Sequence, residues 1–367
     1  MKYKTSFSDT AYNYTTTLFI LSVVLSIFGC LMIFSCTAHI ENSNFLLKQI
    51  VAIILGVLLC FLTTKIDFKI FKKITYPLMI FDLILLFLVF YFPAKNGAHR
   101  WIQLPFFGNF QPAELSKVVL VLFVAKFIDL YRSKIINYKK ELWILLGVIF
   151  IFCILIMLQP DIGTPLLIIS VFLVILFISS MKKDFFLKIV CVALLFLLFG
   201  FLLKPYRIER FKAMLNPWKY QSKVGYQLIQ SYLSLARGHF SGCGLGNGIF
   251  KEYYLPEAHT DFIFCMIGEE LGFIGTTLLV LIYSFICFLG LSLAYKLSSS
   301  KNFYGGIIVL GLTFNIVLQA YISISMALGL LPTKGVGLPF VSYGGSSMIV
   351  NFLSIGIILN MAQRIKG

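Results

Sequence analysis

The first long apolar run of the chain covers residues 18–38 and reads LFILSVVLSIFGCLMIFSCTA. It contains no charged side chain, and it has the length of roughly 20 residues that a helix needs to cross the hydrocarbon core of a bilayer. The polar lead of about 17 residues is long for a secretory signal peptide, and Cys36-Thr37-Ala38 is a poor cleavage site. We therefore predict that this run is a membrane-spanning helix.

Comparable runs recur along the whole chain. Of its 367 residues, 59% are hydrophobic and only 13% are charged, and the mean hydropathy is +0.92. This composition excludes a soluble globular enzyme and a disordered protein, and the absence of apolar–polar alternation excludes a membrane β-barrel. We predict an all-α polytopic membrane protein that forms a single membrane domain over residues 1–367. The expected spans are residues 18–38, 46–64, 75–93, 113–131, 142–158, 163–181, 185–203, 263–290, 304–330 and 343–363.

Basic residues predict the orientation of these spans. With the N-terminus inside, the inner segments hold 18 Lys and Arg residues and the short outer segments hold five. Because Lys and Arg collect in cytoplasmic loops, we predict that both chain ends are cytoplasmic. The long outer loop, about residues 204–262, carries eight more, but loops of that length translocate largely regardless of charge. The net charge of +16 therefore reflects topology rather than nucleic-acid binding, and we expect no nucleic-acid partner. The eight cysteines form no CxxC pair, and no metal site or disulfide framework follows from them.

Acidic residues favour the outer side. Nine of the fifteen lie there: Glu41, Glu114, Asp161, Glu209, Glu252, Glu257, Asp261, Glu269 and Glu270. Ionisable groups near a membrane edge are costly unless they are paired or used, so we look for chemistry at this face. Asp82, inside the third span, does not fit this pattern. It could pair across helices.

Two short outer segments carry candidate binding residues. In residues 96–117, Pro112 suits a helix start, and Glu114 and Lys117 are spaced to pair on one helix face. That pair could be structural or could contact substrate. Arg100 could be an interfacial anchor or could bind a phosphate through its planar donor fork. In residues 159–164, Asp161 could cap the next helix or contact substrate or a cation.

The long outer loop ends in LPEAHTDF, residues 255–262. Glu257, His259 and Asp261 lie within five residues just before a span, where burial or neighbouring charges shift the pKa of an acid and make it usable as a general base. Helix capping is the alternative. The run GCGLGNG at 242–248 does not satisfy GxGxxG, so it is a flexible loop or a set of backbone N–H groups facing phosphate rather than a dinucleotide site.

The last outer loop, residues 331–347, is dense in Gly, Pro and hydroxyl side chains. Irregular backbone at membrane depth is tolerated only where protein or a wet cavity surrounds it. Lys334 is a candidate partner for an anionic head group. Ser342, Gly344, Gly345 and Ser346 are further candidates for substrate contact. Together the outer segments predict a site for a lipid with an anionic head group.

These segments resemble the SEDS family (shape, elongation, division and sporulation), which includes FtsW, RodA and SpoVE. The resemblance rests on residues 96–117, 159–164, 242–275 and 330–347, and it extends from the first span to the last. Ala258 and the LLPTKG run resemble the FtsW branch more than the RodA branch. The Asn-Pro-Trp-x-Asp-Pro motif of FtsW is half present, because Tyr220-Gln221 replaces its Asp-Pro.

The resemblance implies a peptidoglycan glycosyltransferase that polymerises lipid II during septal wall synthesis in the bacterial cytoplasmic membrane. The essential acid of the family's HTDF motif is Asp261 here, and we expect it to act as the general base. Arg100, Lys117 and Lys334 would stabilise the pyrophosphate leaving group, with a divalent cation, Mg²⁺ or Mn²⁺, shared with the substrate. The implied partners are a class B penicillin-binding protein and divisome membrane proteins. The alternatives are a lipid II flippase, a RodA-type elongation polymerase and a scaffold.

Overall fold

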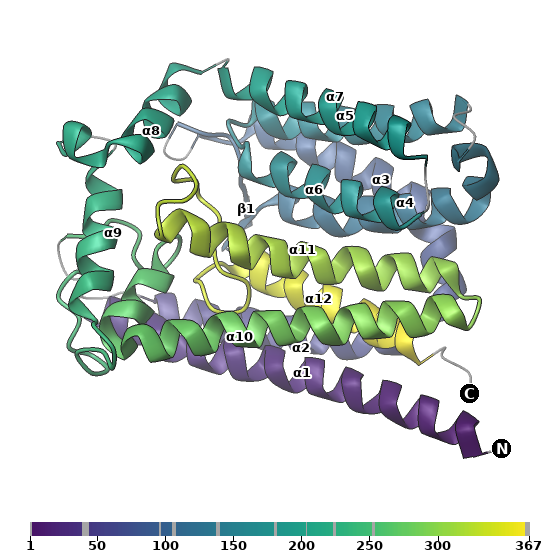
Figure 1. Cartoon of the computed structure of the whole chain (residues 1–367), viewed down its shortest axis with the longest axis horizontal. Helices are drawn as coiled ribbons and strands as arrows, with labels where there is room; N and C mark the ends of the chain where they lie inside the picture. The colour runs from purple at the N-terminus through teal and green to yellow at the C-terminus, as the bar shows by residue number, and fades with distance from the viewer. Residues whose placement is uncertain are drawn as a thin grey trace.

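The computed structural model describes residues 2–38, 44–94, 97–104, 108–136, 140–179, 182–202, 204–222, 225–251 and 254–363. Its long helices run side by side along the longest axis of the molecule, as Figure 1 shows. They are α1 (Lys2–Thr37), α2 (Phe45–Lys65), α3 (Phe68–Leu88), α4 (Pro112–Ile136), α5 (Lys140–Leu158), α6 (Gly163–Ile178), α7 (Lys183–Leu202), α10 (Ile263–Ser299), α11 (Phe303–Ala327) and α12 (Gly345–Ala362). Each predicted span corresponds to one of these helices, so the all-α polytopic fold is confirmed.

Eight of these helices are long and apolar enough to cross a membrane. The exceptions are α6, which has only 16 residues, and α4, whose sequence is interrupted by Lys117, Lys126 and Asp129. The third span begins earlier than predicted. The Asp67 side chain accepts a hydrogen bond from Lys69 N at 3.1 Å and starts α3 at Phe68.

The helices α11 and α12 form the centre of the bundle. Within their apolar windows, 72% and 67% of the residues are buried, against 11% in α7 at the periphery. The principal helix pairs are α2 with α12, α10 with α11, and α3 with α4. Since the apolar side chains of α7 face outward, they are suited to contact lipid tails.

The helix α10 is too long to be one span. Its 37 residues would extend about 55 Å at 1.5 Å per residue, against a hydrocarbon core of about 30 Å. Gly272 interrupts it with φ 67°, and the loop before α10 satisfies the freed backbone, because Phe273 N and Ile274 N donate to the carbonyls of His239 and Phe240. A side chain at residue 272 would collide with that loop. The part of α10 that follows Gly272 is therefore the spanning part.

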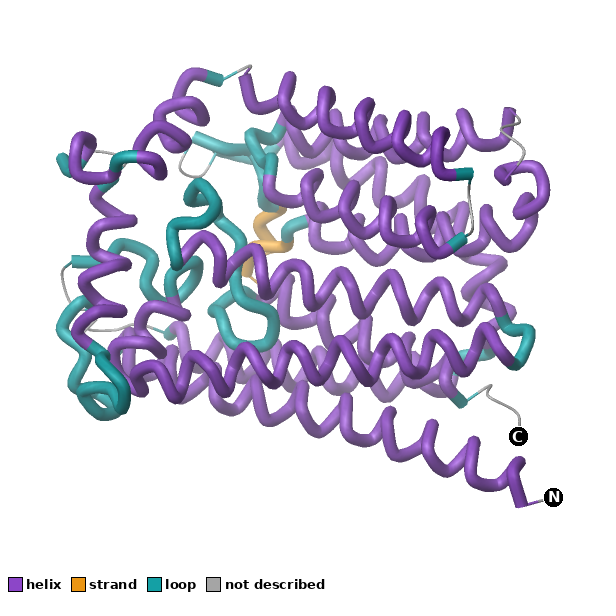
Figure 2. The backbone as a smooth tube through the Cα atoms, in the orientation of Figure 1, coloured by secondary structure: helices purple, strands orange, loops and turns teal. Residues whose placement is uncertain are grey.

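The region predicted as a long outer loop contains three helices as well as irregular segments. It contains α8 (Pro205–Leu215), the short 3₁₀ helix η2 (Pro217–Tyr220) and α9 (Tyr226–Arg237), which lie across the end of the bundle opposite the chain ends (Figure 1). A second 3₁₀ helix, η1 (Val89–Tyr91), follows α3. The strands β1 (Ile102–Leu104) and β2 (Gly108–Phe110) form an antiparallel hairpin that the all-α prediction did not include. Figure 2 shows that most described loops gather at this end, so irregular backbone is concentrated there.

Candidate functional site

A cavity of about 1320 Å³ opens at the end of the bundle that carries α8 and α9. Its wall is built from α2, α4, α6, α8, α11, the start of α12 and the loops between them. All twelve site residues predicted from the sequence line it: Arg100, Glu114, Lys117, Asp161, Glu257, His259, Asp261, Lys334, Ser342, Gly344, Gly345 and Ser346. Segments that lie far apart in the sequence thus meet at one place, although this placement does not by itself assign a role to any residue.

Asp261 lies two residues before α10, at the end of a turn in which its N–H donates to the Glu257 carbonyl at 3.2 Å. The pKa of the Asp261 carboxyl is raised to about 7. Burial is the largest cause and the like charge of Glu257 adds to it, whereas Arg100 and Arg210 oppose the rise. The residue is half-buried by surface area because it faces the open cavity. A carboxyl that titrates near neutral pH is suited to general-base chemistry.

Arg100 is held beside Asp261 by backbone carbonyls. Its Nε donates to the Gln159 carbonyl at 3.1 Å, and its Nη2 donates to the Pro160 carbonyl. A methyl group added at Gly335 would lie 3.4 Å from Asp261 Oδ2 and 3.9 Å from Arg100 Nη1. Gly335 therefore lies beside both charged groups, at ordinary van der Waals distance.

Glu114 and Lys117 form the predicted ion pair, with 2.8 Å between Lys117 Nζ and Glu114 Oε2. Lys117 Nζ also donates to Gln319 Oε1 of α11 at 2.6 Å. Lys117 is 4% exposed and Glu114 is 8% exposed, so both are buried, yet both line the cavity. The structural and substrate-contact interpretations are therefore compatible.

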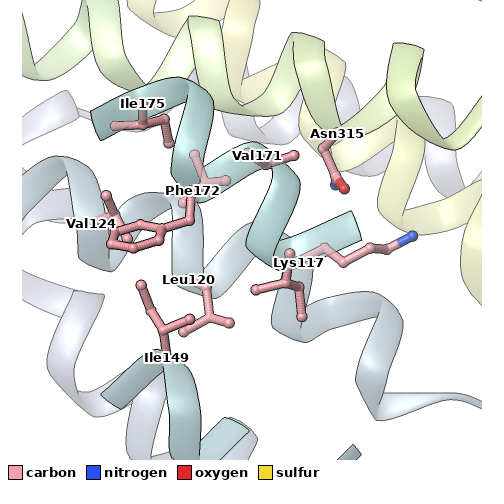
Figure 3. A pocket seen from close by; sticks show the side chains of 10 residues that line it. Lys117, Leu120, Val124, Ile149, Val171, Phe172, Ile175 and Asn315 are labelled. Carbon is pink, nitrogen blue, oxygen red and sulfur yellow. The ribbon is translucent and has the colours of Figure 1, made fainter. Parts of the chain in front are cut away.

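The surroundings of Lys117 are strongly asymmetric. On the side of its aliphatic stem lies a small apolar pocket of about 10 Å³ between α4, α5, α6 and α11, lined by side chains such as Leu120, Ile149 and Phe172. Figure 3 shows the ammonium group of Lys117 pointing away from these side chains. The pocket has room for no more than about one water molecule, so the ligand-sized space lies on the ammonium side.

Asp161 caps α6, as one of the two interpretations predicted. Its Oδ1 accepts hydrogen bonds from Gly163 N and Thr164 N at 2.9 and 3.2 Å, and its Oδ2 accepts one from Thr164 Oγ1 at 2.7 Å. Across the cavity, burial lowers the pKa of the Lys334 ammonium, Asp161 opposes that shift, and Arg207 and Arg210 add to it. Asp161 therefore stabilises the charge of Lys334 as well as the helix end.

Gln49 of α2 holds the last outer loop in shape. Its amide donates to the Ser342 carbonyl at 3.2 Å and accepts from Gly344 N at 3.2 Å. Ser342 Oγ donates to the Thr260 carbonyl at 2.6 Å, which joins this loop to the HTDF segment. Ser346 Oγ accepts from Gln111 N at 3.1 Å and donates to the Asn109 carbonyl at 3.0 Å.

His259 packs against aromatic rings. Its ring lies 4.6 Å from that of Phe45 and 5.7 Å from that of Tyr343, centroid to centroid, and the His259 carbonyl accepts from Tyr343 N at 2.9 Å. Gly345, which begins α12, packs near Ala52 of α2. These contacts fix the cavity wall around Asp261.

Three further cavity residues, Arg207, Arg210 and Gln319, and the buried Gln49 that supports the last outer loop, were missed by sequence reasoning. Arg207 and Arg210 lie three residues apart on α8, and their i,i+3 spacing puts them on one face. Arg210 Nη1 donates to the Thr333 carbonyl at 2.6 Å, and Arg207 is buried at 4% exposure with its Nη2 unpartnered. The spacing of the two arginines could have revealed them. Gln49 and Gln319 carry no sequence signal, because a lone Gln in an apolar run is uninformative.

The acids Glu269 and Glu270 do not line the cavity. Glu270 pairs with Lys251 at 2.7 Å and accepts from Gly246 N at 3.1 Å, and Glu269 accepts from Ile249 N at 2.8 Å. The two carboxylates thus tie the glycine-rich loop to α10. Since these backbone N–H groups are already used, they are not free to bind phosphate.

No group of three or more His, Cys, Asp or Glu side chains in the described ranges is arranged to hold a metal ion. Among the cavity carboxylates, Glu114 pairs with Lys117, Asp161 accepts from backbone and hydroxyl donors at the start of α6, and Glu257 accepts from the Thr260 hydroxyl. The donor set therefore does not fit a resident metal, and we assign no step of a reaction to one.

Comparisons with known proteins agree with this architecture. The family model FTSW_RODA_SPOVE, described as "Cell cycle protein", matches residues 15–367. The chain is 34% identical over 365 residues to a probable peptidoglycan glycosyltransferase FtsW of Geobacter sp. (strain M18), covering 97% of this chain and 98% of that protein. It is 32% identical over 355 residues to stage V sporulation protein E of Bacillus subtilis (strain 168), covering 94% and 96%. Its fold matches a chain from a solved peptidoglycan synthase complex with a TM-score of 0.79 and 26% identity, covering 95% and 97%.

Proposed function

Because this chain belongs to the FtsW/RodA/SpoVE family of cell cycle proteins, we propose that it is a multi-pass membrane glycosyltransferase that polymerises lipid II into glycan strands. The observation that carries this proposal is the cavity, where Asp261 lies among the side chains of Arg100, Arg210 and Lys334. One acid of raised pKa among fixed cations is what glycosyl transfer from a pyrophosphate donor requires.

The cavity has the polarity gradient that lipid II requires. Near Asp261 it is cationic, which suits a pyrophosphate. Toward α2 it is lined by the apolar side chains of Leu47, Val51 and Leu55, of which Leu47 and Val51 are 64% and 47% exposed on the bundle surface. A lipid tail on that surface would lead into the cavity without leaving an apolar environment.

In the proposed reaction, the Asp261 carboxylate accepts the proton of the acceptor sugar hydroxyl. The hydroxyl oxygen forms a bond to the anomeric carbon of the donor, and the bond from that carbon to the pyrophosphate oxygen breaks. Undecaprenyl pyrophosphate leaves with the electron pair, and Arg100, Lys117 and Lys334 stabilise its charge. Direct displacement inverts the anomeric centre, from an α-linked lipid to a β-linked glycan. Any Mg²⁺ or Mn²⁺ would arrive with the pyrophosphate rather than reside in a protein cage.

We place the cavity at the outer face of the membrane. Lys65 at the end of α2, Lys183 at the start of α7 and Lys296 near the end of α10 all lie at the end of the bundle away from the cavity. That end also carries both chain ends (Figure 1). The positive-inside tendency makes it cytoplasmic, so the substrate would be lipid II that has already crossed the bilayer.

We further propose a role in septal wall synthesis, together with a class B penicillin-binding protein and divisome membrane proteins. The name FtsW of the Geobacter relative and the FtsW-like Ala258 and LLPTKG run support this assignment over an elongation role. A fluorescent fusion should concentrate at the division septum. Uniform labelling of the side wall would favour elongation instead.

The test of the activity uses purified protein in vesicles that contain lipid II and no separate flippase. We expect glycan polymer on gels and no transbilayer movement of lipid II beyond that of empty vesicles. The matched control is the Glu209→Gln variant, because Glu209 is exposed on α8 and does not line the cavity. Lipid II movement without polymer would show a transporter and overturn the proposal.

A further inference from the structure

Two buried charged side chains in the described ranges have an unpartnered polar atom and take part in none of the ion pairs found there, Asp82 on α3 and Arg207 on α8. The pairing of Asp82 across helices that the sequence suggested is therefore not found, and Asp82 does not line the cavity. Arg207 does line it. Because a buried charge without a partner is costly, a cation placed in this way in a cavity wall indicates that an anion binds there.

The guanidinium of Arg207 is held in place by two of its three nitrogens. Nε donates to the Tyr206 hydroxyl at 3.2 Å, and Nη1 donates to the Gly200 carbonyl near the end of α7. The third nitrogen, Nη2, has no partner in the described part of the chain. Since a guanidinium is planar and stays charged, fixing two nitrogens also fixes the direction of the third. Arg207 is thus oriented before any ligand arrives.

Further positive charge gathers beside Arg207. Lys204 is the N-cap residue of α8, is exposed and lines the cavity, and the N-terminus of a helix favours an anion. Burial lowers the pKa of the Lys334 ammonium, and Arg207 adds to that shift as a like charge. We call the part of the wall formed by Lys204, Tyr206 and Arg207 the α7–α8 corner.

The α7–α8 corner is separate from the cations around Asp261. Arg210, one turn further along α8, donates to the Thr333 carbonyl at 2.6 Å, and two residues after Thr333 comes Gly335, which lies beside Asp261. Arg207 is bonded instead to α7, and Figure 1 shows α7 and α10 on opposite sides of the bundle. Asp261 lies just before α10. The cavity therefore has two cationic places.

The proposed reaction needs two such places, because donor and acceptor each carry a pyrophosphate. The pyrophosphate of the donor leaves from the reacting anomeric carbon, so it must lie next to Asp261. A linear strand built from disaccharides requires the acceptor hydroxyl to be on the sugar farther from the lipid. The pyrophosphate of the acceptor is then one disaccharide away from Asp261, and the α7–α8 corner offers a place for it.

An apolar path also leads to the α7–α8 corner. The last turns of α7 expose Leu195, Phe199 and Leu202, which are 64%, 63% and 55% exposed, and Phe201 lines the cavity. A lipid tail on this surface would bring its head group to Arg207. The apolar path along α2 remains for the tail of the other substrate.

We propose that the α7–α8 corner binds the pyrophosphate of the acceptor substrate, with Arg207 as its main contact, while the cations around Asp261 bind the pyrophosphate of the donor. This assignment rests on the proposed function, because it distributes the two substrates of that reaction.

The test couples two lipid II analogues that each have one role. The donor-only analogue is blocked at the acceptor hydroxyl. The acceptor-only analogue has a CH₂ group in place of the oxygen between the anomeric carbon and the pyrophosphate, so its pyrophosphate cannot leave. One coupling joins the two sugars and releases one undecaprenyl pyrophosphate. The KM of each analogue is measured with the other at saturation.

Arg207→Gln should raise the KM of the acceptor-only analogue by about ten- to hundredfold and change that of the donor-only analogue by less than about twofold. Lys204→Gln leaves the anchors of Arg207 intact and should raise the same KM. Lys212→Gln is the matched control. It removes one positive charge from an exposed residue of α8 that does not line the cavity, and both KM values should stay at wild type.

A binding measurement needs no turnover. The acceptor-only analogue carries a pyrophosphate and can occupy both places, so wild type in phosphatidylcholine vesicles should bind two molecules of it per protein. Folded Arg207→Gln should bind one at the same concentration. Added phosphatidylglycerol should not displace either molecule from wild type.

The proposal is overturned if folded Arg207→Gln still binds two molecules, or if its KM for the donor-only analogue rises as much as that for the acceptor-only analogue. It is also overturned if phosphatidylglycerol displaces the molecule that depends on Arg207, because the α7–α8 corner would then bind any anionic head group. Wild-type protein that binds both analogues without coupling them would instead contradict the proposed function, whereas the number of bound molecules would still decide the role of Arg207.

Discussion

The raised pKa of Asp261 predicts how polymerisation depends on pH. The general base must be ionised, and a carboxyl with a pKa of about 7 is ionised to about one tenth at pH 6 and about nine tenths at pH 8. We therefore expect kcat/KM to rise about tenfold over this interval and then level off. A carboxyl at the ordinary value of 3.8 would give a flat profile.

The neighbours of Asp261 set the direction of two further shifts. Burial is the largest cause of the raised pKa, and Glu257 adds to it as a like charge. Glu257→Gln should therefore lower the pKa of Asp261, by on the order of one unit, and move the rising limb to lower pH. Arg210 opposes the rise, so Arg210→Gln should move the limb to higher pH.

The assay is the initial rate of polymer formation from lipid II at subsaturating concentration, measured from pH 5.5 to 8.5. Titration of the substrate pyrophosphate is common to all variants, so differences between their profiles report the protein. The exposed Glu209 provides the control, because Glu209→Gln removes one negative charge away from the cavity and should leave the limb in place. The assignment of Asp261 as the general base would be refuted by a flat wild-type pH profile. It would also be refuted if the rise in rate occurred at the same pH in Glu257→Gln as in wild type.

Four other outcomes follow from the same geometry. Lys117→Met leaves Glu114 buried without its cation and should cost about 3–5 kcal/mol of stability, whereas adding Glu114→Gln should recover thermal stability without recovering polymerisation. Gln49→Leu should lower the free energy of unfolding by about 1–3 kcal/mol, because the Ser342 carbonyl and Gly344 N lose their buried partner. It should also slow polymerisation, as measured on equal amounts of folded protein. Asp261→Asn should raise the unfolding temperature at pH 8 but not at pH 4. Because the folded-state pKa is raised, ionising Asp261 costs stability, and this cost is absent below pH 3.8 and fully present above about pH 7. At about 1.4 kcal/mol per pKa unit, the cost is at most about 4 kcal/mol of unfolding free energy, and solvent in the open cavity reduces it. Chelation with EDTA should slow polymerisation, and added Mg²⁺ should restore it, if a divalent ion travels with the pyrophosphate; an unchanged rate in EDTA would contradict this.

Much of the fold could be predicted because lipid imposes a simple rule. Apolar runs of about 20 residues must be helical, so every expected span corresponds to a helix. The boundaries were less accurate where polar caps and loops decide them, as at Asp67 before α3 and at the Gly272 interruption of α10. Helices α8 and α9 were missed, because they lie outside the apolar runs on which the prediction was based.

The candidate site was predictable where short motifs carry charged residues. Asp261, Arg100 and Lys334 were named from their segments, and the structure brings them to one cavity. Their proximity could not be read from the sequence, because it depends on how α4, α6 and the last outer loop meet. The i,i+3 spacing of Arg207 and Arg210 could have marked them as a pair, but their place in the cavity wall depends on where α8 crosses the bundle.

The most direct test of the account is polymerisation of lipid II by purified Asp261→Asn protein, with lipid II binding measured on the same sample. An amide cannot accept the acceptor's proton, so the account predicts a loss of at least about a hundredfold in polymerisation while lipid II still binds. Polymer formed at the wild-type rate would contradict the central claim.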